Sequence, residues 1–311
     1  MIGSSPELTK LYGQDNLKVV VADSGLGGLS VAALLEKALR TKSYWKNIEI
    51  IFFNAHAKNG YGYNRMSSME ERARVFDSAL FSMEQNFNPD VILIACNTLS
   101  AVYEFTEHKN KINSVVLGII ESGVNILTNF LNQTSDSSVI ILGTSTTIKS
   151  HVHLNRLIAR GFARGRIIEQ VCPELETAIQ NNPQGDEAKL LIEKYIAEAA
   201  QKVSFKNQTL AACLACTHYA YSRNIFDETL KAAFNQNASI LNPNERMIDL
   251  VFEGATGFLH DPNIRVEVHS QVVFGENEIA GISNAVNPFS ALTGNALMNF
   301  KLNPSLFSFE F

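Results

Sequence analysis

The chain has 311 residues, of which 46% are hydrophobic and 18% are charged, and its formal net charge is −5. This length can bury a substantial core, in one large or two modest domains. The lack of a basic excess argues against nucleic acid as the main partner. No signal peptide is expected at the start, and no apolar run is long enough to span a bilayer, so we expect a cytoplasmic protein without a membrane partner.

Short apolar runs rich in β-branched residues predict eight strands along the chain. They lie at 17–23, 48–54, 91–96, 114–120, 138–143, 166–171, 209–215 and 238–242. Segments of helical length lie between them, among them 29–40, 69–87 and 185–203. Because the apolar runs hardly alternate with polar residues, we expect strands that are buried on both faces. The alternation of strand and helix then predicts a doubly wound α/β fold with parallel sheets.

The number of strands exceeds what one compact open sheet usually holds, which favours two α/β domains. Two segments also resemble each other: ILIACNTLSA at 92–101 and LAACLACTHYA at 210–220. This match predicts an approximate internal repeat. We expect a discontinuous first domain of residues 1–118 and 238–311, and a second domain of residues 119–237.

The matching segments place Cys96 and Cys216 where a strand ends and a helix begins. Ligands bind at this edge of open α/β sheets, and a helix N-terminus favours the thiolate form of a cysteine. Asn97-Thr98 and Thr217-His218 follow the cysteines and can cap a helix or hold a carboxylate. Each cysteine could alternatively be a small hydrophobic residue that fills space, but the repetition of one design favours a function.

Two other patterns point to chemistry less strongly. Cys213 and Cys216 form a C-x-x-C pair, but no second pair at metal-like spacing accompanies it, so we expect neither a metal nor a disulfide. The segment VVVADSGLGGLSV places Asp23 and Ser24 at the end of a strand, before a glycine-rich turn. Those two side chains could serve a site, or Asp23 could cap an ordinary turn.

Several motifs together resemble one known family. ADSGLGGLSV, the Tyr61-Gly62 pair, ACNTLSAV, LGIIE, LGTSTTIKS and CTHY occur in the order typical of the glutamate racemases, within the aspartate/glutamate racemase superfamily. The resemblance runs from about residue 19 to residue 251. It implies two α/β domains with the active site between them, glutamate as the substrate, and no pyridoxal phosphate or other cofactor. In this family one cysteine removes the α-proton and another donates a proton to the opposite face.

The resemblance also assigns roles to residues by motif. It implies that Cys96 and Cys216 are the two bases, that Asp23 assists Cys96, and that His218 assists Cys216. The implied substrate-binding residues are Asp23, Ser24, Tyr61, Gly62, Asn97, Thr98, Thr217 and His218. The product D-glutamate would serve peptidoglycan synthesis. The assembly state stays open, with a homodimer among the alternatives.

The chain departs from the family pattern at three positions. Ala55 and Gly60 stand where the family usually has Asp and Pro, and Gln180 stands where it usually has a glutamate that contacts the substrate ammonium. Glu176, one helical turn earlier, can replace that glutamate. The departures leave open a racemase of aspartate or another acidic amino acid, and a degenerate amino-acid-binding homologue. Regulation by a cell-wall precursor also stays open.

Overall fold

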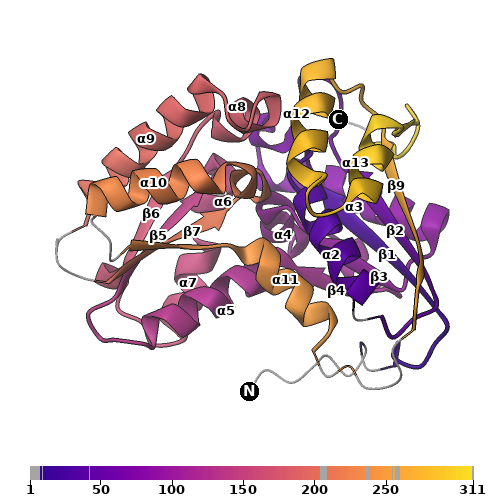
Figure 1. The fold of residues 1–311 in the computed structure, drawn as a ribbon, viewed down its shortest axis with the longest axis horizontal. Helices are drawn as coiled ribbons and strands as arrows, with labels where there is room; N and C mark the ends of the chain where they lie inside the picture. The colour runs from indigo at the N-terminus through magenta and orange to yellow at the C-terminus, as the bar shows by residue number, and fades with distance from the viewer. Residues whose placement is uncertain are drawn as a thin grey trace.

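The computed structural model describes residues 8, 10–41, 43–203, 209–234, 238–253, 255 and 260–309. Two β-sheets lie side by side within it (Figure 1). The first sheet has the order β10-β9-β2-β1-β3-β4, and all its neighbouring strands run parallel. Its strands are β1 (Asn16–Asp23), β2 (Asn47–Asn54), β3 (Val91–Ile94), β4 (Val115–Gly118), β9 (Asn263–Ser270) and β10 (Lys301–Leu302).

The second sheet has the order β6-β5-β7-β8, again with parallel neighbours throughout. Its strands are β5 (Ser138–Gly143), β6 (Ile167–Val171), β7 (Leu210–Ala215) and β8 (Ala238–Leu241). The strands β3 and β7 take equivalent places, since β3 pairs with β1 in one sheet and β7 pairs with β5 in the other. Cys96 follows β3 and Cys216 follows β7 closely, which agrees with the expected internal repeat.

Helices cover both faces of the first sheet because successive side chains of a strand point to opposite sides. Val19 and Val21 pack in the core formed with α2, α11, α12 and α13, whereas Val20 and Ala22 pack in the core formed with α3 and α4. These helices are α2 (Leu29–Thr41), α3 (Met69–Phe87), α4 (Asn97–Tyr103), α11 (Pro243–Val251), α12 (Glu276–Val286) and α13 (Ala291–Met298).

The second sheet is covered in the same way. Ile140 and Leu142 pack towards α8, α9 and α10, and Val139 and Ile141 pack towards α5 and α7. These helices are α5 (Ile119–Leu131), α7 (Val152–Ala159), α8 (Leu175–Asn181), α9 (Asp186–Ala200) and α10 (Arg223–Phe234). The described residues also form the helix α6 (Ser145–Lys149) and the 3-10 turns η1 (Tyr63–Arg65), η2 (His108–Asn110), η3 (Arg164–Arg166) and η4 (Thr217–Ser222). The prediction of a doubly wound α/β fold with two parallel sheets is confirmed.

The eight expected strands are all present, within one or two residues at each end. The helix expected at 69–87 is α3, which starts where the Ser68 side chain accepts a hydrogen bond from the Glu71 N–H and ends at Asn88 in a left-handed conformation. Two further strands, β9 and β10, lie outside the eight that the apolar runs predict. In β9, NIRVEVHS, apolar residues alternate with charged ones, unlike the buried runs that predicted the other strands.

The expected domain boundary at residue 238 does not coincide with the division of the strands between the two sheets. Residues 238–241 form β8, which pairs with β7 in the second sheet, and the chain returns to the first sheet only after it, through α11. The division into 1–118 with 238–311, and 119–237, therefore stays a prediction that the strand pairing does not follow at β8. Among the residues that the structure describes, none of the helices combines the length and apolarity needed to cross a bilayer.

Candidate active site

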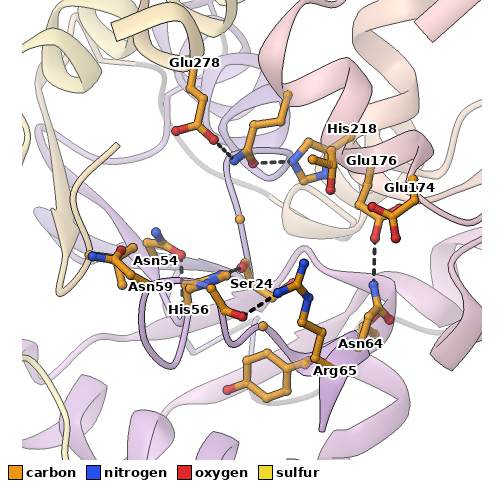
Figure 2. Close-up of a pocket in the computed structure, with 18 of the residues that line it drawn as sticks. Ser24, Asn54, His56, Asn59, Asn64, Arg65, Glu174, Glu176, His218 and Glu278 are labelled. Carbon is orange, nitrogen blue, oxygen red and sulfur yellow. Dashed lines mark hydrogen bonds between the residues drawn. The ribbon is translucent and has the colours of Figure 1, made fainter. Parts of the chain in front are cut away.

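The two sheets with their covering helices form two lobes of the molecule. A cavity of about 480 Å³ lies between these lobes. Its wall combines the loops that follow β1 and β2 and the start of α4 with residues of α8 and η4. Residues 272–274 and Glu278 of α12 line a further side (Figure 2). Loops at the ends of strands from both sheets meet here, which is the place where open α/β folds bind ligands.

The two lobes touch at the glycine-rich turn after β1. A Cβ atom on Gly27 would lie 2.5 Å from both His218 Nδ1 and Thr217 Oγ1, and 2.7 Å from the His218 backbone nitrogen. No side chain fits in this space, so a glycine is required for the turn to approach the segment after Cys216. The glycine motif thus serves a contact between the halves of the molecule, beyond the local turn.

Cys96 lies between the end of β3 and the start of α4 and is 7% exposed. Its Sγ lies 3.1 Å from the Oγ of Ser24. Burial, followed by the negative charge of Asp23, raises the pKa of the Cys96 thiol to about 12. The thiol is therefore its stable form at neutral pH, because desolvation outweighs the short helix that begins beside it.

Cys216 follows β7 and is 6% exposed. Its Sγ lies 3.8 Å from Nδ1 of His218. Burial raises the pKa of the Cys216 thiol well above its usual range, and the nearby charges of Glu176 and then of Cys96 raise it further. Burial also lowers the pKa of His218 to about 4, so its ring is neutral near pH 7. A neutral imidazole can accept the proton of the thiol.

Asp23 is buried, with 1% of its surface exposed. Its Oδ1 accepts a hydrogen bond from the Gly25 N–H at 2.9 Å, and its Oδ2 accepts one from the Thr217 hydroxyl at 2.8 Å. Burial raises the pKa of this carboxyl to about 6, although these hydrogen bonds oppose the shift. The hydrogen-bonding neighbour of Cys96 is Ser24, so Asp23 acts on that thiol through its charge.

Several of the expected substrate-binding residues line the cavity, namely Ser24, Gly62, Thr98 and His218. The Thr98 hydroxyl lies 3.1 Å from the hydroxyl of Thr144 in the other lobe. Asn97 is buried, and its side-chain oxygen and nitrogen both lack hydrogen-bond partners among the described residues. An unsatisfied buried amide is costly, and a bound polar group beside it would remove the cost.

The described residues that line the cavity do not include the expected Cys96, Cys216, Asp23, Asn97 and Thr217. They do not include Tyr61 either, whose side chain lies elsewhere. Its hydroxyl donates to Oε1 of Glu71 at 2.6 Å, and only the following Gly62 lines the wall. The family position at Tyr61-Gly62 therefore contributes backbone here.

The cavity also contains residues that the sequence analysis did not single out. His56, two residues after β2, lies with its Nδ1 3.0 Å from the Ser24 carbonyl oxygen, and Arg65 brings a cationic side chain to the wall (Figure 2). The Asn64 amide donates to Oε1 of Glu176 at 2.8 Å, while Oε2 of Glu176 is buried without a partner among the described residues. The strand-end argument used for the cysteines would have found His56 as well.

Comparison with known proteins gives consistent matches. The sequence profile described as Asp/Glu/Hydantoin racemase matches residues 26–243. A glutamate racemase of Aquifex pyrophilus is 28% identical over 204 residues, which are 65% of this chain and 71% of that protein. The crystal structure of glutamate racemase from Campylobacter jejuni superimposes with a TM-score of 0.64 at 25% identity and covers 87% of this chain and 98% of its own.

A further crystal structure has the same fold. It is a Francisella tularensis glutamate racemase in complex with D-glutamate, with a TM-score of 0.64 at 22% identity, and it covers 88% of this chain and 94% of its own.

Proposed function

Because the chain belongs to the Asp/Glu/Hydantoin racemase family, whose members are isomerases, we propose that it interconverts L- and D-glutamate without a cofactor. Cys96 and Cys216 are the two bases in this proposal. The product D-glutamate would supply peptidoglycan synthesis in the cytoplasm. The relatives named above act on glutamate, and the same substrate is proposed here.

The observation that carries the proposal is the pair of buried thiols at equivalent strand ends of two sheets. Their respective neighbours Ser24 and His218 both line one cavity. Racemisation needs a base on one face of the α-carbon and an acid on the other. The negative charge of either cysteine disfavours ionisation of the other, because Cys96 is among the groups that raise the pKa of Cys216. Such coupling disfavours the state with two thiolates, so one cysteine stays protonated while the other acts as the base.

The proton movements can be written for either direction. When Cys216 acts as the base, its proton passes to Nδ1 of His218 and its thiolate takes the α-proton of the substrate. The resulting carbanion takes a proton from the Cys96 thiol, and the Ser24 hydroxyl at 3.1 Å donates to the thiolate that forms. The opposite enantiomer reacts through the same groups in reverse order.

The polar groups of the wall support an acidic amino acid as substrate. Glu176 offers a buried carboxylate oxygen that has no partner within the described part of the chain, which suits the ammonium group. An ammonium there offsets the charge that raises the pKa of Cys216. The Ser24 and Thr98 hydroxyls and the unsatisfied amide of Asn97 suit a carboxylate. Arg65 offers a positive charge for a second carboxylate.

The test is turnover by the purified protein, followed as loss of optical rotation from either enantiomer of glutamate. The expected result is racemisation that survives dialysis against a chelator and does not need added pyridoxal phosphate. Aspartate, assayed in parallel, decides the substrate preference. Tight binding of glutamate without turnover would replace the proposal by that of a degenerate binding protein.

A further inference from the structure

Gln180, on α8, makes hydrogen bonds to three separate parts of the chain. Its Oε1 accepts from the Leu26 N–H at 3.0 Å and lies 2.8 Å from Nε2 of His218. Its Nε2 donates to Oε1 of Glu278 on α12 at 2.5 Å. Figure 2 shows one dashed line at Glu278 and another at His218, which are two of these hydrogen bonds. A position that departs from the family pattern therefore lies at the centre of a hydrogen-bonded chain.

The neighbours of Gln180 fix which way its amide points. With the amide reversed, its NH2 group would face the N–H donor of Leu26, and its oxygen would face the carboxylate of Glu278. Both contacts would be repulsive, since donors would meet donors and acceptors would meet acceptors. The amide oxygen therefore faces His218.

The amide oxygen in turn fixes the tautomer of His218. An oxygen can only accept, so the proton of the neutral ring resides on Nε2, and Nδ1 carries a free lone pair. That lone pair is on the nitrogen 3.8 Å from Cys216 Sγ. The ring is thus in the form that can take a proton from Cys216.

The carboxylate of Glu278 is also held by a hydrogen bond from its own helix. Its Oε2 accepts a hydrogen bond from the Gly275 N–H at 2.6 Å, at the start of α12. Its carboxylate therefore faces Gln180 in a fixed orientation, and α12 packs against α8. A negative charge at this end of the chain of hydrogen bonds stabilises the positive charge that His218 gains when it takes a proton.

We propose that Glu278 and Gln180 are positioning residues for Cys216, which hold His218 as its proton acceptor and stabilise the protonated ring. The inference rests on the two-thiol function proposed above. Neither residue contacts the reacting carbon in this scheme, and both act through His218. We call the chain of hydrogen bonds from Glu278 through Gln180 to His218 the relay. Cys96 has Ser24 as its neighbour instead, so the relay serves one of the two bases only. Glu278 lies beyond the residues matched by the family profile, 26–243.

The first test reads the tautomer directly and needs no substrate. Protein labelled with ¹⁵N in histidine is examined by long-range ¹H–¹⁵N NMR, with the His218 signals assigned from a His218→Gln variant. We expect the Nε2–H form in the unaltered protein and a mixture of tautomers in Gln180→Leu. The matched control is Gln184→Leu, because Gln184 is an exposed glutamine that bonds the Tyr221 carbonyl instead. A His218 signal unchanged by Gln180→Leu overturns the relay.

The second test exchanges the charges. Gln180→Glu brings a second carboxylate against Glu278, and we expect kcat/KM to fall about 10-fold to 100-fold, as in Gln180→Leu. In the double variant Gln180→Glu/Glu278→Gln, the new carboxylate again accepts from Leu26 and His218, and the new amide donates to it. We expect the double variant to recover most of the loss. A double variant no better than the worse single variant contradicts the proposal.

The third test separates positioning from general damage. In Gln180→Leu the primary isotope effect of α-deuterated substrate should rise in the direction in which Cys216 takes the α-proton, and fall in the other direction. General damage would change both directions alike, which would overturn the relay. If the unaltered protein racemises neither glutamate nor aspartate, the proposed function fails, while the tautomer measurement still decides the relay.

Discussion

The hydroxyl of Thr217 donates a hydrogen bond of 2.8 Å to Oδ2 of Asp23, from one lobe of the molecule to the other. Thr217 directly follows Cys216, and the charge of Asp23 raises the pKa of both Cys96 and Cys216. The bond therefore links the segment that carries Cys216 to a carboxylate of the opposite lobe that acts on both thiols. A two-base reaction needs this relation, because both bases must reach one carbon atom.

The first prediction concerns the two thiols. Cys96→Ala and Cys216→Ala should each abolish racemisation while the protein stays folded, because each variant lacks the base on one face of the α-carbon. The control is Cys213→Ala, because Cys213 is also buried but lies within β7 and packs in the core towards α5 and α7. Circular dichroism and turnover of both enantiomers provide the measurement. A tenth or more of the original activity in either variant would be incompatible with two bases.

The second prediction concerns the contact between the lobes. Gly27→Ala places a Cβ atom 2.5 Å from His218 Nδ1 and Thr217 Oγ1, so the segment after Cys216 must move. We expect a loss of about 1–3 kcal/mol in the free energy of unfolding, and a fall in kcat that exceeds any rise in KM. Gly165→Ala is the control, because a Cβ there meets nothing within 4 Å. Equal behaviour of the two variants would show that the contact is not needed.

The third prediction concerns the ammonium group. Glu176→Gln removes the negative charge from a carboxylate whose Oε2 has no partner among the residues that the structure describes. KM for glutamate should therefore rise about 10-fold, the loss of one charge-assisted hydrogen bond. Glu187→Gln is the control, since Glu187 is exposed at the start of α9. Initial rates over a range of substrate concentrations give kcat and KM separately. An unchanged KM would remove Glu176 from the site.

Much of the fold and part of the site could be predicted from the sequence, because the patterns that indicate them lie within short segments of the chain. The apolar runs predicted β1 to β8, and the matching segments led to Cys96 and Cys216. The family resemblance is confirmed by the profile match over residues 26–243. Glu278 could not be predicted in the same way, because it lies 98 positions from Gln180 and reaches the site only through the packing of α12.

Burial also changes the protonation that the sequence predicts for single residues. A helix N-terminus favours a thiolate, but the desolvation of Cys96 and Cys216 raises both pKa values instead. The family's usual glutamate at position 180 would not suit this chain, since the Gln180 side chain donates to Glu278 and a glutamate there would face a second carboxylate.

The fourth prediction concerns stability and pH, where two buried groups act in opposite senses. Burial raises the pKa of Asp23 to about 6, so its contribution to stability is complete below pH 3.8 and is lost as the pH rises through 6. Burial lowers the pKa of His218 to about 4, so its contribution is present above pH 6.5 and is lost as the pH falls through 4. Between these limits the two effects largely cancel.

Variants that remove one of the two titrations should therefore change the pH dependence of the free energy of unfolding in opposite directions between pH 4 and pH 6.5. Removing the titration of Asp23, in Asp23→Asn, should make the free energy of unfolding rise more steeply with pH than in the unaltered protein. His218→Gln should make it rise less steeply or fall. Each change should amount to about 2–3 kcal/mol over the interval, measured by urea unfolding at several pH values. Parallel curves for the three proteins would contradict the assigned shifts.

The last prediction follows the proton. If Cys96 and Cys216 act on opposite faces, the proton taken from the substrate remains on one thiol while the product receives its hydrogen from the other. Early in a reaction in D2O, the product enantiomer should carry deuterium at the α-carbon, and the remaining substrate should carry almost none. Chiral separation and mass spectrometry at low conversion measure the label in each enantiomer. The same pattern is required from both directions, because the thiols exchange the roles of acid and base. A single base moving between the faces would return the original hydrogen to the product, and such product from either direction would exclude the mechanism.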